Sequence, residues 1–338
     1  MDKVRFGRTG LQVSRIALGG IPIMRVPLED AVAIVHEAIN SGINYIDTAN
    51  AYDDSEIKIG AAIKGIPREE LVIATKSGAA DKQTLNKHLE QSLKQLGVDY
   101  IDVYQLHNIA NQKLEDLYAP GGAYEGLVEA IQAGKVRFPA FSCHSVPIAL
   151  KTMREGRFDV VQLPFNYIDT EAAAEAIPLA KELDMGFIAM KPMGGGMLYD
   201  AGLSFRYLMQ FDNIIPDPGI ERLEELREIV GIVTGGQPLT DEDRAEIERL
   251  RRETSGSWCH RCGYCQPCPQ GIAISNVLTS KSYLKRYTIA GAEGMASSAI
   301  EKARGCIECR ECVARCPYNL EIPTMLKESI AYWDACRA

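Results

Sequence analysis

Eight of the ten cysteines form two regularly spaced groups in the last part of the 338-residue chain. They are Cys259, Cys262, Cys265 and Cys268, followed by Pro269, and Cys306, Cys309, Cys312 and Cys316, followed by Pro317. Cysteines separated by two residues can direct several thiolates at one metal centre, as in iron–sulfur clusters and zinc sites. A zinc ion takes four ligands, so a third cysteine at this spacing and the Cys-Pro endings exceed what a simple zinc site needs. The pattern favours iron–sulfur ligation over zinc, and disulfides least.

The sequence before the cysteines alternates short apolar, β-rich runs with amphipathic helical stretches. Eight runs predict strands: RIALGG (15–20), INYIDTA (43–49), LVIATKSG (71–78), IDVYQLH (101–107), VRFPAFS (136–142), DVVQLPFN (159–166), FIAMKPMG (187–194) and NIIPDPG (213–219). Helices are predicted between them, for example over 28–41, 55–64, 82–96 and 124–133. Such units predict parallel strands closed into a TIM, or (β/α)8, barrel, which commonly takes about 250 residues. An open doubly wound α/β sheet is disfavoured because no GxGxxG follows the first strand.

The sequence changes character near residue 254. A charged stretch with a helical pattern covers 242–253, the segment 254–257 (TSGS) breaks it, and strand–helix alternation then stops. We therefore predict two domains, a barrel over 1–253 and a small, mainly helical cysteine domain over 254–338. From Cys259 onward the chain has ten Lys and Arg against seven Asp and Glu, a net charge of +3, whereas the preceding residues carry −11. A charge of +3 without a basic cluster is weak support for nucleic-acid binding, which we do not predict.

The composition is typical of a folded protein, with 46% hydrophobic and 24% charged residues. No run of eighteen apolar residues occurs, and the opening MDKVRFGRTG lacks the apolar stretch of a signal peptide. We therefore expect a cytoplasmic protein without a membrane span. Thiols stay reduced in that compartment, which favours metal binding for the spaced cysteines. Of the two remaining cysteines, Cys143 is interpreted as a small apolar filler and Cys336 as a thiol of a terminal helix.

The cysteine domain resembles the bacterial two-cluster ferredoxins. This resemblance implies two 4Fe-4S clusters, each held by three cysteines of one group and by the cysteine that precedes proline in the other. By that pattern Cys259, Cys262 and Cys265 share a cluster with Cys316, and Cys306, Cys309 and Cys312 share one with Cys268. The first group departs from the ferredoxin pattern because two residues, rather than three, precede Cys268. Four arginines among the ligands would offset the negative charge of the clusters and account for the basic tail: Arg261, Arg304, Arg310 and Arg315.

The predicted barrel resembles the aldo/keto reductases. The matching segments are GINYIDTANAY (42–52), SE (55–56), ATK (74–76) and YQLH (104–107), with RTGLQVSR (8–15), GKVR (134–137) and weaker similarity over 3–226. The family's catalytic Asp, Tyr, Lys and His would here be Asp47, Tyr52, Lys76 and His107. Asp47, Lys76 and His107 end predicted strands, where barrel enzymes keep their chemistry. Each residue alone has an ordinary structural explanation, but the four together at consecutive strand ends favour a catalytic group.

The implied chemistry centres on a tyrosine that needs help to act as an acid. A phenol with a pKa near 10 is a poor proton donor at neutral pH. The ammonium of Lys76, paired with Asp47, would lower the pKa of Tyr52 and let it protonate a carbonyl oxygen while hydride reaches the carbon. His107 would orient the carbonyl through a hydrogen bond. The expected substrate is a small carbonyl compound or alcohol.

The resemblance also implies an NAD(P)H site, with several departures from the family. The family holds the nicotinamide amide with a Ser-Asn pair and a Gln, for which this chain offers Ser142, followed by Cys143, and Gln162. Met190 stands where a Tyr often stacks on the ring. The segment 218–226, with Gly219 and Arg222, is mostly acidic where the family commonly places Lys or Arg. The preference between NADH and NADPH stays open, as does the role of the glycines at 194–196, a phosphate approach or a flexible loop.

Three functional hypotheses follow, because iron–sulfur clusters move single electrons and hydride carries two. The first is an NAD(P)-dependent carbonyl/alcohol oxidoreductase that exchanges electrons with a ferredoxin-like or flavoprotein partner. The second keeps the barrel but uses a flavin, or electrons supplied through the clusters, in place of a nicotinamide. The third is a non-catalytic electron-carrier subunit with a vestigial barrel, which the complete catalytic group disfavours.

Overall fold

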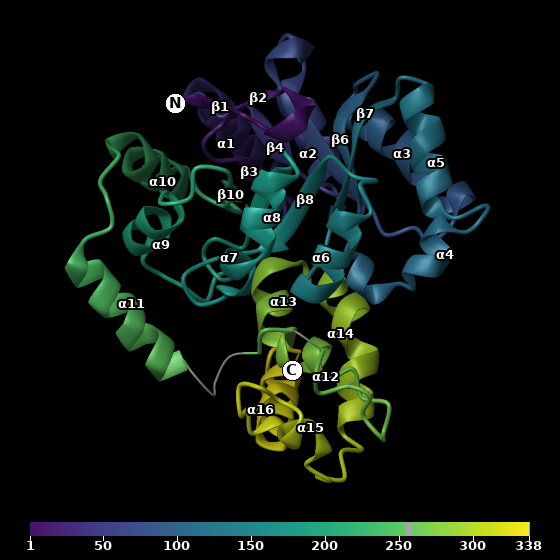
Figure 1. Cartoon of the computed structure of the whole chain (residues 1–338), viewed down its shortest axis with the longest axis vertical. Helices are drawn as coiled ribbons and strands as arrows, with labels where there is room; N and C mark the ends of the chain where they lie inside the picture. Colours follow the sequence, from purple (N-terminus) through teal and green to yellow (C-terminus); the bar gives the residue numbers. More distant parts are fainter. Residues whose placement is uncertain (255–258, 262, 338) are drawn as a thin grey trace. The chain divides into compact units, whose positions relative to one another are not determined.

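The computed structural model describes residues 1–254, 259–261 and 263–337, so the predicted ligand Cys262 lies outside the described residues. The chain forms two units, Met1–Leu239 and Thr240–Ala338, which take the purple-to-green and the green-to-yellow parts of the colour bar in Figure 1. The division precedes helix α11 (Asp241–Thr254), whereas the sequence analysis places the boundary after residue 253. The helix is rich in charged residues and buries Ile247, so its composition carries little information about the unit to which it belongs.

Eight parallel strands form the first unit, each hydrogen-bonded to the next in sequence order. They are β3 (Leu18–Gly19), β4 (Tyr45–Asp47), β5 (Val72–Ser77), β6 (Ile101–Leu106), β7 (Val136–Ser142), β8 (Val160–Pro164), β9 (Gly186–Met190) and β10 (Ile215–Asp217). The first and last strands meet, because Gly19 pairs with Gly219 and the Gly19 amide donates to the Pro218 carbonyl at 2.8 Å. A Cβ atom on Gly19 would lie 2.9 Å from that carbonyl oxygen, so glycine permits the closure. The predicted barrel is confirmed.

A short hairpin packs against the amino ends of the barrel strands. Its strands are β1 (Lys3–Arg5) and β2 (Gln12–Ser14), which pair antiparallel. Phe6, between them, packs among the inward residues of the barrel, and its ring lies 5.5 Å from that of Tyr45, edge to face. The sequence analysis does not predict this hairpin, because three-residue strands are too short to show a β pattern.

Helices surround the strands of the first unit (Figure 1). They are α1 (Leu28–Asn40), α2 (Ser55–Ile63), α3 (Lys82–Leu96), α4 (Leu114–Tyr118), α5 (Ala123–Gln132), α6 (Val146–Arg154), α7 (Glu171–Ala174), α8 (Ala176–Glu182), α9 (Ala201–Leu208) and α10 (Leu223–Gly235), with 3-10 turns at Gly7–Thr9, Pro22–Arg25, Arg68–Glu70 and Ile109–Asn111. The four helices predicted by example are confirmed within a residue at each end. Helix α3 shows why: Asp81 caps its first turn at 2.9 Å and Gly97 ends it in the left-handed region.

The second unit is helical, as predicted. After α11 come α12 (Ile274–Leu278), α13 (Ser280–Arg286), α14 (Ile289–Ala303), α15 (Glu311–Ala314) and α16 (Ile322–Ala335). Apolar side chains from these helices form its core, including the buried Val277, Ile300, Leu326 and Trp333. Six of the predicted metal ligands lie in or against the same core: Cys259, Cys265, Cys268, Cys306, Cys312 and Cys316.

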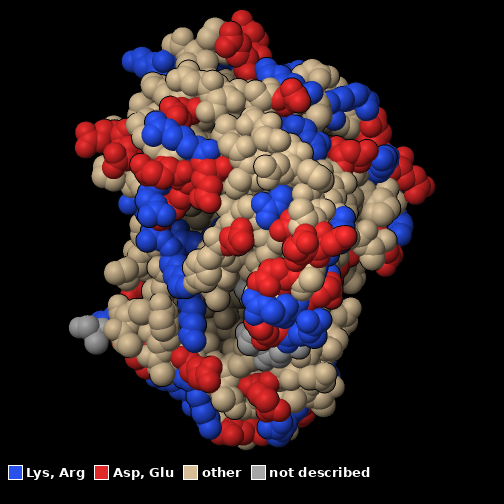
Figure 2. Space-filling model, turned by 90° about the vertical axis from the view of Figure 1, so that its left-hand side faces the viewer, with Lys and Arg blue, Asp and Glu red and all other residues tan. Residues whose placement is uncertain are grey.

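Charged side chains of both signs share the face shown in Figure 2. Exposed ion pairs also form within single helices, such as Arg249 with Glu246 and Glu253 on α11. Exposed pairs of this kind contribute at most about 1 kcal/mol each, so the folded state depends chiefly on its apolar core. In the described part of the chain, no helix is both long and apolar enough to cross a membrane.

Candidate active site and cluster sites

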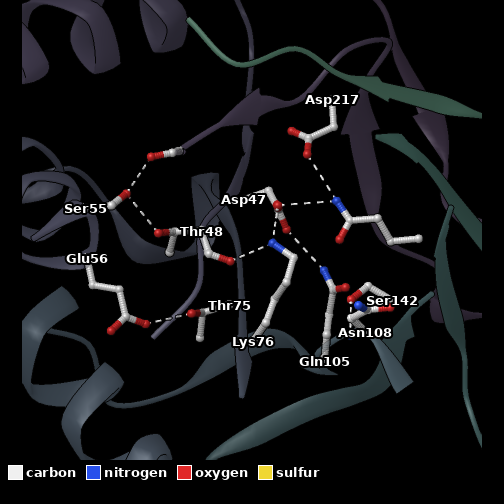
Figure 3. Close-up of polar contacts among 12 residues, drawn as sticks. Asp47, Thr48, Ser55, Glu56, Thr75, Lys76, Gln105, Asn108, Ser142 and Asp217 are labelled. Carbon is white, nitrogen blue, oxygen red and sulfur yellow. Dashed lines mark hydrogen bonds and ion pairs between the residues drawn. The ribbon is translucent and has the colours of Figure 1, made fainter. Parts of the chain in front are cut away.

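Lys76 and Asp47 form a buried ion pair at the carboxyl ends of two neighbouring strands. Asp47 ends β4 and Lys76 lies on β5, and each side chain is less than 5% exposed. The Lys76 ammonium also donates to the carbonyl oxygen of Thr48 at 2.7 Å. The other carboxylate oxygen of Asp47 accepts a hydrogen bond from Gln105 at 3.1 Å, and Figure 3 shows Lys76 and Gln105 both directed at Asp47. Both charges are therefore satisfied, which a buried pair requires.

Tyr52 and His107 complete the predicted catalytic group beside this pair. Tyr52 is 5% exposed, and the Lys76 nitrogen lies 5.2 Å from the centre of its ring. The turn between β4 and α2 fixes its backbone, since the Tyr52 amide donates to Ala49 at 3.0 Å and its carbonyl accepts from Ser55 at 2.8 Å. The His107 ring follows β6 and lies 5.8 Å from the Tyr52 ring at an angle of 82°. The structure thus brings the four residues together.

The surroundings of His107 favour the neutral imidazole. Burial, together with the nearby cations Lys76 and Lys191, lowers the pKa of His107 to about 3. A neutral imidazole can donate one hydrogen bond and accept another. His107 can therefore orient a carbonyl oxygen, but it is not a source of protons at neutral pH.

We expect His107 to remain neutral between about pH 5 and pH 8. Nitrogen-15 NMR of histidine-labelled protein would check this, with His107→Asn assigning the signal. Because an unfolded histidine has a pKa of about 6.5, the unfolded chain takes up this proton first, and His107 lowers the free energy of unfolding as the pH falls below that value. A His107 signal that titrates with a midpoint near 6.5 would contradict the lowered pKa.

A second carboxylate, which the sequence analysis did not single out, is linked to this group. Asp217 ends β10, and Gln162 on β8 donates from its amide nitrogen to Asp217 at 3.1 Å and to Asp47 at 3.3 Å. Gln105 was also missed. The available signal was a polar residue inside a predicted buried strand, as at Gln105 and Asp217, although the sequence does not say which partner such a residue meets.

Three of the predicted cofactor residues lie on barrel strands near the catalytic group, two of them at strand ends. Ser142 ends β7, and its hydroxyl accepts a hydrogen bond at 2.9 Å from the backbone of Asn108, next to His107. Gln162 donates to Asp47, as described, and its amide oxygen is buried without a partner among the described residues. Met190 ends β9 in register with Asp217. These side chains are placed to line one end of the barrel.

The other predicted cofactor residues have structural roles in the fold. Gly219 closes the barrel against Gly19, and a Cβ atom there would lie 2.7 Å from the Pro22 ring. Arg222 is exposed and donates to Glu225 at 2.7 Å, one helical turn away at the start of α10. Its guanidinium is therefore held by its own helix.

Cys143, which stands where the family has Asn, is buried. Burial raises the pKa of its thiol to about 11. The thiol is therefore neutral at physiological pH and donates to the Ser145 carbonyl at 3.3 Å. This environment is that of a packed, unreactive cysteine, in line with the interpretation as an apolar filler.

Seven cysteines of the second unit line two separate cavities. The first is lined by Cys259, Cys265 and Cys316. The second is lined by Cys268, Cys306, Cys309 and Cys312. Cys316 thus lies with the first sequence group and Cys268 with the second. Among the described residues, no three His, Cys, Asp or Glu side chains are grouped so that they could hold a single metal ion.

These donor sets fit iron–sulfur clusters. Four thiolates are the usual ligands of a 4Fe-4S cluster. The second cavity supplies four cysteines and the first supplies three, with Cys262 outside the described residues. Buried apolar residues line both cavities, and one of them, Ile274, is shared by the two linings.

Comparison with known proteins finds matches to both parts of the chain. Residues 15–204 match the model of the aldo/keto reductase family, and residues 258–321 match a 4Fe-4S dicluster domain. The uncharacterized oxidoreductase YrpG of Bacillus subtilis (strain 168) is 30% identical over 227 residues, which are 59% of this chain and 68% of that protein. An NADH-specific methylglyoxal reductase of Escherichia coli (strain K12) is 27% identical over 228 residues, 59% of this chain and 69% of the relative.

A solved structure has the same barrel. An aldo-keto reductase from Bacillus halodurans in its holo form superposes with a TM-score of 0.64 at 23% identity, covering 74% of this chain and 96% of the other. The structural match concerns the fold of the barrel. The sequence matches cover the segments that carry its motifs. This chain therefore belongs to the aldo/keto reductase family of oxidoreductases and carries a 4Fe-4S dicluster domain after the barrel.

Proposed function

We propose that this chain catalyses carbonyl/alcohol redox chemistry on a small molecule, with Tyr52 as general acid and base, and that it exchanges electrons through two 4Fe-4S clusters. The observation that carries the proposal is the buried Lys76 ammonium, paired with Asp47 and 5.2 Å from the centre of the Tyr52 ring. The Lys76–Asp47 ion pair does not need a neighbouring tyrosine for its stability. A phenol that acts as an acid and base does need a fixed cation nearby.

Each residue of the group has a distinct task in the proposed reaction. Tyr52 donates its proton to the carbonyl oxygen, and the Lys76 ammonium stabilises the phenolate that remains. Asp47 holds Lys76 in place, and the Gln105 amide holds Asp47. The neutral His107 donates a hydrogen bond to the same carbonyl oxygen and orients it. In the reverse direction the Tyr52 phenolate accepts the proton of an alcohol.

The residues at the barrel's end fit a nicotinamide, which when bound supplies or accepts the hydride. The buried amide oxygen of Gln162 has no partner among the described residues and can accept a hydrogen bond from a carboxamide. Ser142 offers a hydroxyl at the end of the neighbouring strand, and Met190 an apolar face. A relative named as an NADH-specific reductase supports this cofactor class.

The two cysteine-lined cavities support one cluster in each. We assign Cys259, Cys262, Cys265 and Cys316 to the first cluster and Cys268, Cys306, Cys309 and Cys312 to the second. Bound clusters pass single electrons, and their natural partner would be a ferredoxin-like protein or a flavoprotein. The chain's own contribution is the thiolates and the apolar shell, which limits the access of water.

A second candidate keeps the barrel chemistry but draws its electrons through the clusters, with a flavin or without any nicotinamide. Two observations favour it. Arg222, the one basic candidate for an adenosine phosphate, is engaged by Glu225, and Cys143 replaces the family's Asn with a neutral thiol.

Calorimetry on anaerobically purified protein separates the two candidates. The first predicts saturable binding of NADH or NADPH and oxidation of the bound dinucleotide when small carbonyl compounds are added. The second predicts carbonyl reduction with a chemical one-electron donor and no binding of either dinucleotide. Flavin released on heating would favour the flavin form of the second candidate. The absence of carbonyl reduction under both conditions would reject the proposed activity.

A further inference from the structure

The cysteine-rich unit repeats one sequence pattern with opposite charges at an equivalent position. In the first repeat Arg261 immediately precedes the second cysteine, and in the second repeat Glu308 does so. The backbone agrees with this alignment, because both residues have a positive φ, 59° for Arg261 and 53° for Glu308. Gly271 and Asn319 also match, each three residues after the Cys that precedes proline and each with a positive φ, 65° and 54°. The two repeats therefore share these backbone conformations and differ in charge at the residue before the second cysteine.

Each of the two charged residues lines the cavity of its own repeat. Arg261 lines the first cavity and is half-buried, and its Nε atom is buried without a hydrogen-bond partner among the described residues. Glu308 lines the second cavity, is exposed, and pairs with Lys327 at 2.6 Å. Arg310, which also lines the second cavity, is neutralised by Glu321 at 2.9 Å. The first cavity is thus lined by the cation Arg261. The second is lined by the anion Glu308 at the equivalent position and by Arg310, and each of these two charges is neutralised by an ion pair.

Charge beside a cluster site changes how easily the site accepts an electron. Reduction adds one negative charge, so a neighbouring cation stabilises the reduced form and a neighbouring anion destabilises it. A guanidinium keeps its charge at every physiological pH, and it acts more strongly when partly buried than when it is exposed and screened by salt. Arg261 is half-buried and Glu308 is exposed, so salt screens the charge of Arg261 less than that of Glu308.

We propose that Arg261 and Glu308 separate the reduction potentials of the two cluster sites, giving the site of Cys259, Cys265 and Cys316 the higher potential. This inference rests on the proposed presence of a cluster in each cavity. One electron from a one-electron carrier then settles on the first site: the carrier is oxidised by one electron, the first site is reduced by one, and no bond or proton changes. The second site is reduced only at a lower potential.

The test is a potentiometric titration followed by electron paramagnetic resonance on anaerobically purified full-length protein. We expect two separate reduction steps in the wild type. Arg261→Gln should lower the upper potential and leave the lower one in place. Loss of one charge-assisted contact changes the reduction equilibrium about tenfold, which is 59 mV for a one-electron couple. Glu308→Gln should raise the lower potential by a smaller amount because Glu308 is exposed and paired. The gap between the steps therefore narrows in both variants.

Two controls make the result specific. Arg337→Gln removes one charge from the same unit at a residue that pairs with Glu293 and is absent from both cavity linings, so both potentials should stay unchanged. Arg261→Lys keeps the charge and should keep the upper potential near the wild-type value, and it carries the test if Arg261→Gln loses its cluster.

The possible failures are distinguishable. Wild-type protein that lacks iron and sulfide would reject the proposed clusters themselves. Variants with wild-type iron content and unmoved potentials would overturn the charge asymmetry alone. A shift of the lower potential in Arg261→Gln would overturn the assignment of Arg261 to the higher-potential site.

Discussion

Replacement of Tyr52 by Phe lowers kcat for carbonyl reduction by about 100- to 10,000-fold, the usual contribution of a positioned general acid. The variant keeps the ring that packs beside Lys76 and His107 and removes only the hydroxyl, so folding and cofactor binding should persist. Steady-state kinetics, with calorimetry for binding, measure the two effects separately. KM should change little, because the lost interaction is made in the transition state.

Tyr124→Phe is the matched control for this variant. It removes another phenol hydroxyl from the same barrel, one that lies on helix α5 and donates to the Arg157 carbonyl at 3.2 Å. Its rate should stay within about twofold of wild type, as expected for a change remote from the reacting group. Equal rates for Tyr52→Phe and wild type would show that the hydroxyl of Tyr52 takes no part in proton transfer.

Replacement of Cys316 by Ser removes the cluster of the first cavity and leaves the second, so about half of the iron and sulfide is lost. The reason is the lining of the cavities, which places Cys316 with Cys259 and Cys265 although it follows the other group in sequence. Metal analysis and electron paramagnetic resonance of anaerobic protein measure the loss. Cys268→Ser should remove the other signal, because Cys268 lines the second cavity.

Cys336→Ser is the control for the cluster variants, since Cys336 is exposed on the last turn of the chain and is absent from both cavity linings. It should keep the full iron content. If Cys316→Ser and Cys306→Ser lost the same resonance signal, ligation would follow the sequence groups, and the crossed assignment would be wrong.

The barrel could be predicted from the sequence because each of its strands is a continuous β-rich run between amphipathic helices. The fold of Ile101–Leu106, for example, follows from a run that is buried on both faces. The β1–β2 hairpin could not be predicted, because its strands have only three residues each. Its position depends on the contact between Phe6 and Tyr45, which forms only in the folded chain. The boundary near α11 was equally out of reach, because a charged helix does not reveal which unit it joins.

The catalytic group could be proposed because the sequence resembles the aldo/keto reductases, and the residues that match the family's catalytic group stand at or after the ends of successive predicted strands. Its supporting residues Gln105 and Asp217 could not be predicted, because they are single polar residues in apolar runs. Gln162 was proposed as a cofactor residue, but its hydrogen bonds to Asp47 and Asp217 join distant strands and could not be predicted. Arg222 illustrates the opposite case. Its partner Glu225 is three residues away, a spacing at which side chains of a helix start meet, so this pairing could have been anticipated.

The central claim is that Lys76 acts on the reaction through Tyr52, and a double-mutant cycle of Tyr52→Phe and Lys76→Met measures it most directly. Single-turnover rates would be taken on variants whose folding is checked by circular dichroism, because an uncompensated buried Asp47 costs about 3–5 kcal/mol of stability. Residues that act as one unit give strongly non-additive effects, so the double variant should be about as slow as Tyr52→Phe alone. Rate losses that multiply in the double variant would mean that the ammonium and the phenol act independently, contrary to the mechanism.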